Sequence, residues 1–349
     1  MRGRTRDRGL SRTRSGHRWM KGATPLFASL TVFRREGSVA ALLLLILAAV
    51  GALNPAFVRP ANLQNMLVDA VPTVIVACGM TLVIVTGEID ISVGSLMGLL
   101  AMMLGRMTSP THANLPVAAG VVAVVLVGTA VGLLNGVLVT LARLPSIIVT
   151  LGMLTILQGA GLILMNGEWI TDLPAGLRVF GIGRWLGIPL SLWTAGAVLA
   201  LSLVLAHRTP LGRRLWAVGS NPHAARLAGL RVNGLKLFAF VLTGFLTAVA
   251  TVVSVPRLGV IESGVGQGFE LLVITCVVVG GTSISGGRGT ILGSVLAALL
   301  LGVVGHMLVF LHLGLSAAYW DRAILGAFIL AAVLADHLSR RRNVRGASA

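Results

Sequence analysis

The sequence places two carboxylates, Glu88 and Asp90, inside the otherwise apolar stretch GMTLVIVTGEIDISVGS at 79–95. A carboxylate deep in a bilayer costs about 3 kcal/mol or more, so the pair needs a structural or a functional reason. The structural reason would be helix capping, in which Asp90 or Ser92 accepts free backbone N–H groups while Glu88 points to water. The functional reason would be a polar substrate pathway beside the broken helix. The two interpretations are compatible.

A second polar interruption, VVGGTSISGGRGTILGS at 278–294, is rich in glycine and hydroxyl side chains. A phosphate-binding P-loop would need Gly-Lys-Ser/Thr at the start of a helix, and this segment contains no lysine. The only lysines of the chain are Lys21 and Lys236, so the sequence contains no Walker A motif. If ATP powers this protein, the nucleotide must bind to another chain.

No other pattern indicates an enzyme or a bound cofactor. The seven histidines lack metal-ligand spacing and no Gly-x-Ser-x-Gly motif is present, so neither a metal site nor a hydrolase is predicted. Cys78 and Cys276 lie within apolar runs and are interpreted as small core residues. Asn135 and Gln158 are isolated amides inside apolar segments, where an amide serves as an interhelical hydrogen bond or as a ligand contact.

The composition indicates which kind of fold must position these side chains. Of the 349 residues, 56% are hydrophobic and only 11% are charged. Soluble domains carry about 25% charged residues, and disordered chains are poor in apolar ones, so both classes are excluded. The expected fold class is therefore all-α, a polytopic bundle of membrane helices.

Ten apolar segments approach the roughly 17–25 residues that an α-helix needs to cross a bilayer. The second, third and eighth are short or interrupted, and glycines repeat every four residues in the third and fourth, which favours close helix packing. The candidate spans are residues 39–54, 70–86, 91–107, 115–142, 147–165, 190–206, 237–255, 269–285, 290–313 and 320–336. An even number of spans places both termini on the same side of the membrane.

The distribution of basic residues predicts that this side is the cytoplasm. The net charge of +17 includes 28 Lys and Arg, of which ten lie in residues 1–36, six at 208–236 and four at 340–345. Such clusters beside apolar segments are typical of cytoplasmic loops rather than of nucleic-acid-binding surfaces, so no nucleic-acid partner is expected. Arg143 and Arg288 are expected on the cytoplasmic side as well. The stretches expected to face outside are residues 54–69, 166–189 and 256–268.

The chain is accordingly divided into three parts. Residues 1–36 are expected to be a basic, disordered cytoplasmic tail, 37–336 the transmembrane domain, and 337–349 a cytoplasmic C-terminal tail. The one sizeable polar stretch between spans is the cytoplasmic loop 207–236. It contains a helix-compatible run that Gly229 closes, which predicts a short helix with a turn on each side.

The stretch at 79–95 closely resembles a motif of the permease subunits of monosaccharide ABC importers of the ribose, xylose, arabinose and rhamnose type. Three further segments fit in the expected order: 144–164 (LPSIIVTLGMLTILQGAGLIL), 209–232 (TPLGRRLWAVGSNPHAARLAGLRV) and 278–294. The likeness runs from about residue 37 to 336. Family members commonly have two glycines before Ile-Asp, whereas the second position here is Glu88.

The resemblance implies a permease that carries a pentose or deoxyhexose, such as ribose or rhamnose, across the bacterial inner membrane by alternating access. It further implies two ATP-binding subunits, a second permease subunit in a homo- or heterodimer, and a periplasmic sugar-binding protein. ATP hydrolysis would occur on the separate ATPase, so this subunit is itself no enzyme. A neutral sugar needs hydroxyl and amide partners. The candidate pathway residues are Glu88, Asp90, Ser92, Ser95, Asn135 and Gln158.

By the same resemblance, residues 209–232 correspond to the cytoplasmic segment that couples the permease to the ATPase. The residues assigned to coupling are Leu211, Gly212, Arg213, Leu215, Gly219, Asn221, Ala225, Arg226 and Gly229. The apolar contact with the ATPase would come from Leu211, Leu215, Trp216 and Leu227, with Arg213, Arg214 and Arg226 at its rim. The main alternative function is an ion-coupled secondary transporter that uses Glu88 and Asp90. A passive channel, or an importer permease for a substrate other than a sugar, are further alternatives.

Overall fold

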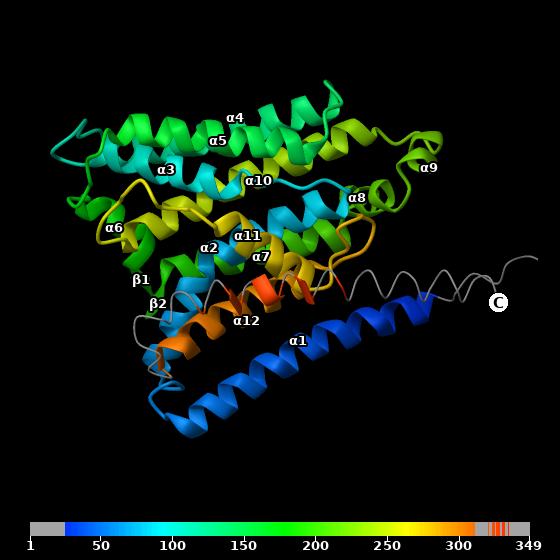
Figure 1. The fold of residues 1–349 in the computed structure, drawn as a ribbon, viewed down its shortest axis with the longest axis horizontal. Coiled ribbons are helices and arrows are strands. Elements are labelled where there is room, and N and C mark those ends of the chain that lie inside the picture. The colour runs from blue at the N-terminus through cyan, green and yellow to red at the C-terminus, as the bar shows by residue number, and fades with distance from the viewer. Residues whose placement is uncertain are drawn as a thin grey trace, which may run out of the picture.

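The structure, a computed structural model, describes residues 25–310 and the helical positions 320, 323–324, 326–328, 330–331 and 334, with side chains from residue 36 onward. These residues form a helical bundle with one short hairpin of two two-residue strands, which confirms a predominantly helical polytopic fold (Figure 1). The long helices are α1 (Pro25–Leu53), α2 (Pro60–Val85), α4 (Val117–Thr140), α5 (Ser146–Met165), α7 (Leu190–Arg208), α10 (Val232–Ser254) and α12 (Ile291–Phe310). The shorter elements are α3 (Val93–Thr108), α6 (Ala175–Ile182), β1 (Arg184–Trp185), β2 (Ile188–Pro189), α8 (Pro210–Ser220), α9 (Pro222–Leu227), the 3-10 turn η1 (Val255–Arg257) and α11 (Phe269–Val279).

Seven of the described helices are long and apolar enough to cross a membrane, against the ten spans expected from the sequence. The expected third and eighth spans correspond to α3 and α11, which have only 16 and 11 residues. Both are short because polar, glycine-containing segments interrupt the apolar runs. Of the expected tenth span, 320–336, the structure describes only separate helical positions between residues 320 and 334.

The N-terminal boundary differs from the expected one. The first helix begins at Pro25, so the expectation of disorder is wrong for residues 25–36. Continuous hydrogen bonding extends the apolar helix backward through less apolar residues, because a preformed helix is easily lengthened at its end. The remainder of the predicted basic tail, residues 1–24, and the tail at 337–349 lie outside the described residues.

The centre of the bundle is α2, whose residues from Val71 to Val85 are almost all buried. It packs against α7, α10, α11 and α12, and α10 packs against α4 on its other side. At that second contact the backbones approach closely, since a Cβ added to Gly244 would lie 2.9 Å from the Cα of Gly132. The four-residue glycine repeat in α4 therefore serves helix packing, as expected.

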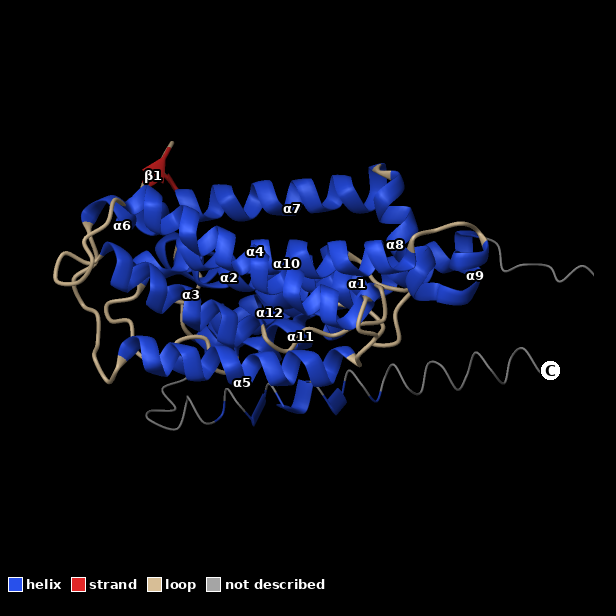
Figure 2. Ribbon diagram, turned by 90° about the horizontal axis from the view of Figure 1, so that it is seen from above, coloured by secondary structure: helices blue, strands red, loops and turns tan. Residues whose placement is uncertain are grey.

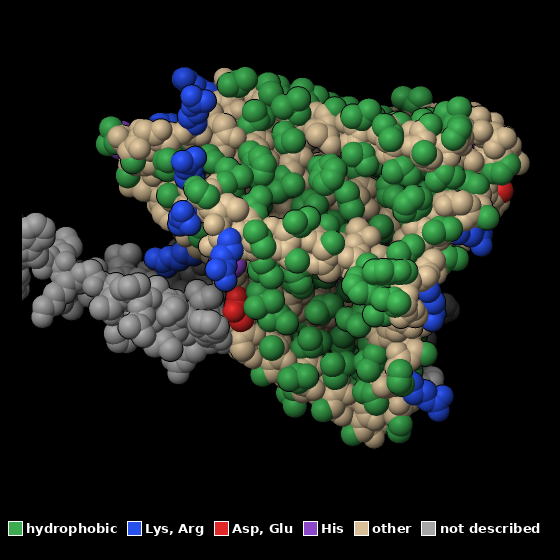
Figure 3. Space-filling view, turned by 180° about the vertical axis from the view of Figure 1, so that it is seen from behind, with side chains coloured by type: hydrophobic (Ala, Val, Ile, Leu, Met, Phe, Trp, Pro, Cys, Tyr) green, Lys and Arg blue, Asp and Glu red, His purple; other side chains and the backbone are tan. Residues whose placement is uncertain are grey.

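The connections between helices gather at two ends of the bundle (Figures 1 and 2). One end carries α8 and α9, and the other carries α6 and the hairpin. At the latter end, a bridge between Ile170 and Ile261 joins two of the stretches predicted to face outside. Lys and Arg side chains lie toward the two ends, with a broad hydrophobic band between them (Figure 3). This arrangement agrees with a bundle that spans a membrane between those ends.

Candidate functional site

The polar break between α2 and α3, residues 86–92, lies at the α8–α9 end of the bundle. Asp90 is buried, and its carboxylate accepts hydrogen bonds from the Ser92 backbone N–H at 2.9 Å and from the Ser92 hydroxyl at 2.6 Å. The Ser92 hydroxyl in turn accepts a hydrogen bond from the Asn135 side-chain amide at 2.9 Å. Three of the predicted pathway residues therefore form one hydrogen-bonded chain. The capping prediction is wrong for the first turn of α3, because no described side chain accepts its N–H groups and Asp90 accepts instead the backbone N–H of the N-cap residue Ser92.

Glu88 pairs with Lys236 at the start of α10, which corrects the expectation that Glu88 points to water. The two side chains are only 14% and 18% exposed. In this partly desolvated place the carboxylate requires a counter-charge, and the lysine supplies it. From the sequence, Lys236 served to exclude ATP binding and counted among the basic residues at 208–236, and no partner was assigned to it. A single lysine beside an apolar segment was the available signal that the lysine pairs with an acidic residue.

The backbone of the break is held by α5 as well. The Ile89 N–H donates a hydrogen bond to the Ser146 hydroxyl at 3.3 Å. We call residues 86–92, together with Asn135, Ser146 and Lys236, the polar junction. Because α4, α5 and α10 each contribute one of its partners, any movement of these helices relative to one another must alter the junction.

The glycine-rich connection between α11 and α12, residues 280–290, joins the polar junction to α8. The Gly287 N–H donates a hydrogen bond to the Val85 carbonyl at 2.8 Å, and the Trp216 indole donates one to the Gly289 carbonyl at 3.0 Å. Gly219 fits against this connection so closely that an added Cβ would lie 2.6 Å from the Gly287 nitrogen. Helix α8 is therefore in direct contact with the end of α2 and with the connection that leads into α12.

The predicted coupling segment forms two helices rather than one. Thr209 caps α8 by accepting a hydrogen bond from the Gly212 N–H, and Asn221 caps α9 by accepting one from the Ala224 N–H. A proline follows each cap at the first helical position, where its fixed φ suits the turn. Gly229 has a φ of +79°, so it closes the segment as predicted.

The faces of α8 and α9 correct part of the expectation about apolar contact with an ATPase. Leu215 is fully buried in the bundle, and Gly212, Gly219 and Ala225 are also buried. Leu211 and Trp216 are half-buried and pack against the same core. Amphipathic α8 has turned its apolar side inward, because the nearest large apolar surface belongs to its own chain. The exposed residues of the two helices include Arg213, Arg214, Ala217, His223, Arg226 and Leu227.

Two predicted pathway residues lie apart from the polar junction. Ser95 is buried inside α3, and within the described residues its hydroxyl has no hydrogen-bond partner. Gln158 lies exposed on the outer surface of α5. The grouping of Gln158 with Asp90 and Asn135 is therefore wrong for this subunit, because the rotation of α5 directs that side chain away from the bundle.

A cavity in the other half of the bundle contains ionisable residues that the sequence reasoning did not select. It has a volume of about 840 Å³ and lies among α2, α10, α11, α12 and the loop before α11. Asp69 of α2 lines it and pairs with Arg257 at 2.8 Å and with His306 of α12 at 3.1 Å. Asp69 had been placed at the margin of an outer stretch and His306 had been overlooked. An acid and a histidine inside apolar runs were the available signal.

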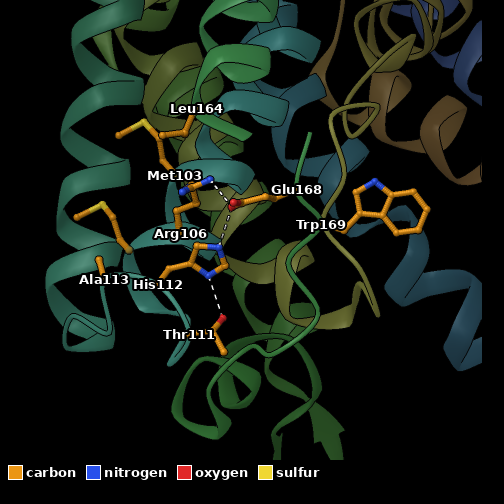
Figure 4. Close-up of a pocket in the computed structure, with 9 residues that line it drawn as sticks. Met103, Arg106, Thr111, His112, Ala113, Leu164, Glu168 and Trp169 are labelled. Atoms are coloured by element: carbon orange, nitrogen blue, oxygen red, sulfur yellow. Dashed lines mark hydrogen bonds and ion pairs between the residues drawn. The ribbon is translucent and has the colours of Figure 1, made fainter. Parts of the chain in front are cut away.

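A surface pocket of about 710 Å³ occupies the end opposite α8 (Figure 4). Glu168 binds Arg106 at 2.9 Å and approaches the His112 ring at 3.4 Å, whereas Trp169 points away from this group (Figure 4). Nearby, Asp172 accepts hydrogen bonds from Thr111 and Ser109, which hold the pKa of that carboxyl below its usual value. These contacts tie the connection after α3 to the one after α5.

Comparisons with known proteins agree with this arrangement. Residues 62–333 match the family model described as "Branched-chain amino acid transport system / permease component". The chain is 38% identical over 299 residues to the ribose import permease of Escherichia coli K12, covering 84% of this chain and 91% of that protein. It is 35% identical over 315 residues to the autoinducer 2 import permease of Yersinia pestis Pestoides F, covering 89% and 88% respectively. No solved structure matches. The chain therefore belongs to this family of membrane permease components, and its resemblance is to the permeases of monosaccharide ABC importers.

Proposed function

We propose that this multi-pass inner-membrane protein is the permease subunit through which an ABC importer passes a pentose or deoxyhexose into the cytoplasm. The observation that carries this proposal is the placement of α8 and α9. They lie at one end of a membrane bundle, present an exposed basic face, and contact both the end of α2 and the glycine-rich connection into α12. Similarity to a ribose import permease supports the choice of a monosaccharide.

The α8–α9 end is proposed to face the cytoplasm and to rest on two ATP-binding subunits. It carries the basic loop 208–236, and Lys and Arg concentrate in cytoplasmic loops. Arg213, Arg226 and Leu227 are the exposed contacts, whereas the buried Leu215, Gly212 and Gly219 join α8 to the bundle. Leu211, Asn221, Ala225 and Gly229 position the two helices.

Transport is proposed to proceed by alternating access between two conformations of a pair of permease subunits. Nucleotide binding stabilises one conformation relative to the other, and α8 transmits the difference to the polar junction through Val85 and Gly287. A periplasmic sugar-binding protein delivers the sugar at the opposite end. Ser92, Ser95 and Asn135 remain proposed pathway residues, and exposed Gln158 belongs to the pathway only if a second permease covers α5.

Transport in proteoliposomes tests this function. The permease is reconstituted with ATP inside and no ion gradient, either alone or with its ATP-binding and sugar-binding partners. The expected result is saturable uptake of at least one of D-ribose, D-xylose, L-arabinose and L-rhamnose only when the ATPase is present. Uptake by the permease alone, driven by a proton or sodium gradient, would contradict the proposal.

A further inference from the structure

Asp69 occupies an unusual place for a carboxylate. It is the tenth of the 26 residues of α2, a helix that is apolar enough to cross the membrane, and its side chain is 47% exposed. A charge that faced lipid in the hydrocarbon core would cost about 3 kcal/mol or more, which favours a position where Asp69 faces water or polar groups. The space that Asp69 faces is the cavity of about 840 Å³ described above. A water-filled cavity inside the bundle is the environment that accommodates an exposed charge there.

The walls of the cavity combine a few polar groups with large apolar surfaces. The polar side chains are those of Asp69, Ser254, Arg257 and Gln267. Among the described residues, the Gln267 side-chain amide makes no hydrogen bond, so both its donor and its acceptor remain available. The apolar walls come from residues such as Val71, Leu272 and Leu301. A pocket of a few hundred to about 1,000 Å³ with few polar groups on an apolar wall is typical of small-molecule sites.

The charges of the cavity indicate what kind of molecule fits. The carboxylate of Asp69 and the guanidinium of Arg257 neutralise each other at 2.8 Å, so the wall attracts neither anions nor cations strongly. Together they still present acceptors and donors side by side, which is what a sugar hydroxyl requires because it both donates and accepts. The apolar wall suits the C–H faces of a sugar ring. His306 binds the second oxygen of Asp69 at 3.1 Å and so acts as a positioning residue.

We propose that this cavity is a binding site for a neutral monosaccharide within the permease itself, with Asp69, Arg257 and Gln267 as its hydrogen-bonding groups. The inference rests on the proposed function and adds a site to it. A lipid acyl chain in the same space is the competing occupant, and it would leave Asp69 without a polar neighbour from the ligand.

Thiol labelling tests the site directly, because the two native cysteines are buried. Gln267→Cys is made in the full chain, reconstituted with its ATP-binding partner, and labelled with a charged, membrane-impermeant thiol reagent. Val260→Cys is the matched control, since Val260 is exposed in the same loop but does not line the cavity. D-ribose, D-xylose, L-arabinose and L-rhamnose are each added in excess, and L-glutamate serves as a charged control solute.

The expected result is labelling of Gln267→Cys that slows about fivefold with the sugar that the wild-type complex imports, but not with L-glutamate. Protection should be lost when Asp69→Asn is added, because replacing the carboxylate removes a charged hydrogen-bond acceptor, a loss equivalent to about tenfold in affinity. Labelling of Val260→Cys should be unchanged by any sugar. This readout does not require the variants to transport.

Three results would overturn the inference while leaving the proposed function intact, provided that wild type imports one of the sugars. They are unaltered labelling of Gln267→Cys with that sugar, equal protection of Val260→Cys, and complete inaccessibility of Gln267→Cys, which indicates lipid or closed packing. If the wild-type complex imports none of the four sugars, the proposed function fails first, and the cavity proposal fails with it.

Discussion

The acidic residues just after α2 and the one within it, Asp69, lie in opposite kinds of surroundings. At the α8–α9 end, Glu88 and Asp90 are enclosed and bound by groups of the chain itself, Lys236 and Ser92. In the other half of the helix, Asp69 also has protein partners, yet it remains half exposed to a cavity. A carboxylate in an apolar segment is therefore not sufficient to identify a substrate site. What separates the two regions is whether space for a ligand remains beside the charge.

The difference also separates their proposed roles. The polar junction consists of buried or partly buried contacts between residues 86–92 and side chains of α4, α5 and α10, so it is suited to holding helices in one arrangement. The cavity has polar groups with unused hydrogen-bonding capacity, so it is suited to binding. The variants below break the polar junction or its contact with α8, and the last one breaks a contact at the opposite end of the bundle, in order of decreasing expected effect.

The largest effect is expected for Gly219→Ala at the contact between α8 and the polar junction. The new Cβ would collide with the Val85 carbonyl and lie 2.6 Å from the Gly287 nitrogen, so the backbones must separate. ATP-driven sugar uptake should fall at least about tenfold, because the close contact of α8 with Val85 and Gly287 is lost. The protein should still insert in the membrane, because the variant leaves the membrane-spanning helices unchanged. Uptake and ATPase rate in proteoliposomes measure the uncoupling.

Gly234→Ala is the matched control for that variant. Its added Cβ would meet only the Arg231 side chain at 3.9 Å, which is ordinary contact. It should transport like wild type. Normal uptake by Gly219→Ala would contradict the role of the α8 contact.

Removing Lys236 should strongly destabilise the polar junction. Lys236→Met leaves Glu88 partly buried without its counter-charge, and loss of one partner of such a pair costs about 3 kcal/mol. The thermal unfolding midpoint in detergent should therefore drop. In the double variant Glu88→Gln/Lys236→Met, most of the loss should be recovered. Equal destabilisation of the single and double variants would show that the pair itself is not the cause.

A smaller effect is expected for Asn135→Ala in the same junction. The variant removes the hydrogen bond from the Asn135 amide to the Ser92 hydroxyl, whose net value is about 1 kcal/mol. Thr129→Val on the same helix is the control, since its hydroxyl bonds only the Val125 carbonyl of its own helix. The thermal unfolding midpoint of Asn135→Ala should be lower than that of Thr129→Val. The reverse order would argue against the hydrogen-bonded chain of Asp90, Ser92 and Asn135.

The smallest effect concerns Asp172 at the opposite end, where the carboxylate is exposed. The pKa of Asp172 is lowered in the folded protein, so its carboxylate stabilises the folded state above its ordinary pKa. This stabilisation is lost as the pH falls through the lowered pKa. Hydrogen exchange at the Thr111 amide, which donates to Asp172 at 3.2 Å, should be faster in Asp172→Asn than in wild type near neutral pH. The difference should shrink in acid, and a difference independent of pH would contradict this assignment.

Local sequence was a good guide to elements whose signals lie within a few residues. Gly229, predicted to close the helix-compatible run in 207–236, does so with a φ of +79°. The grouping of connections was predictable for two of the three expected outer stretches, 166–189 and 256–268, which meet at the Ile170–Ile261 bridge. The start of α1 at Pro25 was not, because a helix can extend beyond its apolar segment.

The candidate site was less predictable, for reasons that individual residues illustrate. Glu88 was expected in water because its partner, Lys236, is 148 positions away in the sequence. Leu215 was expected outside because hydrophobicity alone does not tell which large surface an amphipathic helix will cover. Gln158 and Asp69 have similar apolar neighbours in sequence, yet one lies on the outside of α5 and the other opens into a cavity.

By itself, the sequence determined that this protein is a helical membrane permease, where its helices break, and which connections share an end. These properties follow from composition, charge distribution and turn residues, all of which act locally or against the membrane. Only the tertiary structure decided that Glu88 pairs with Lys236, that α8 joins α2 to the glycine-rich connection, and that Asp69 faces a cavity. Those depend on helix rotation and packing, in which residues far apart in the chain compete for the same partners.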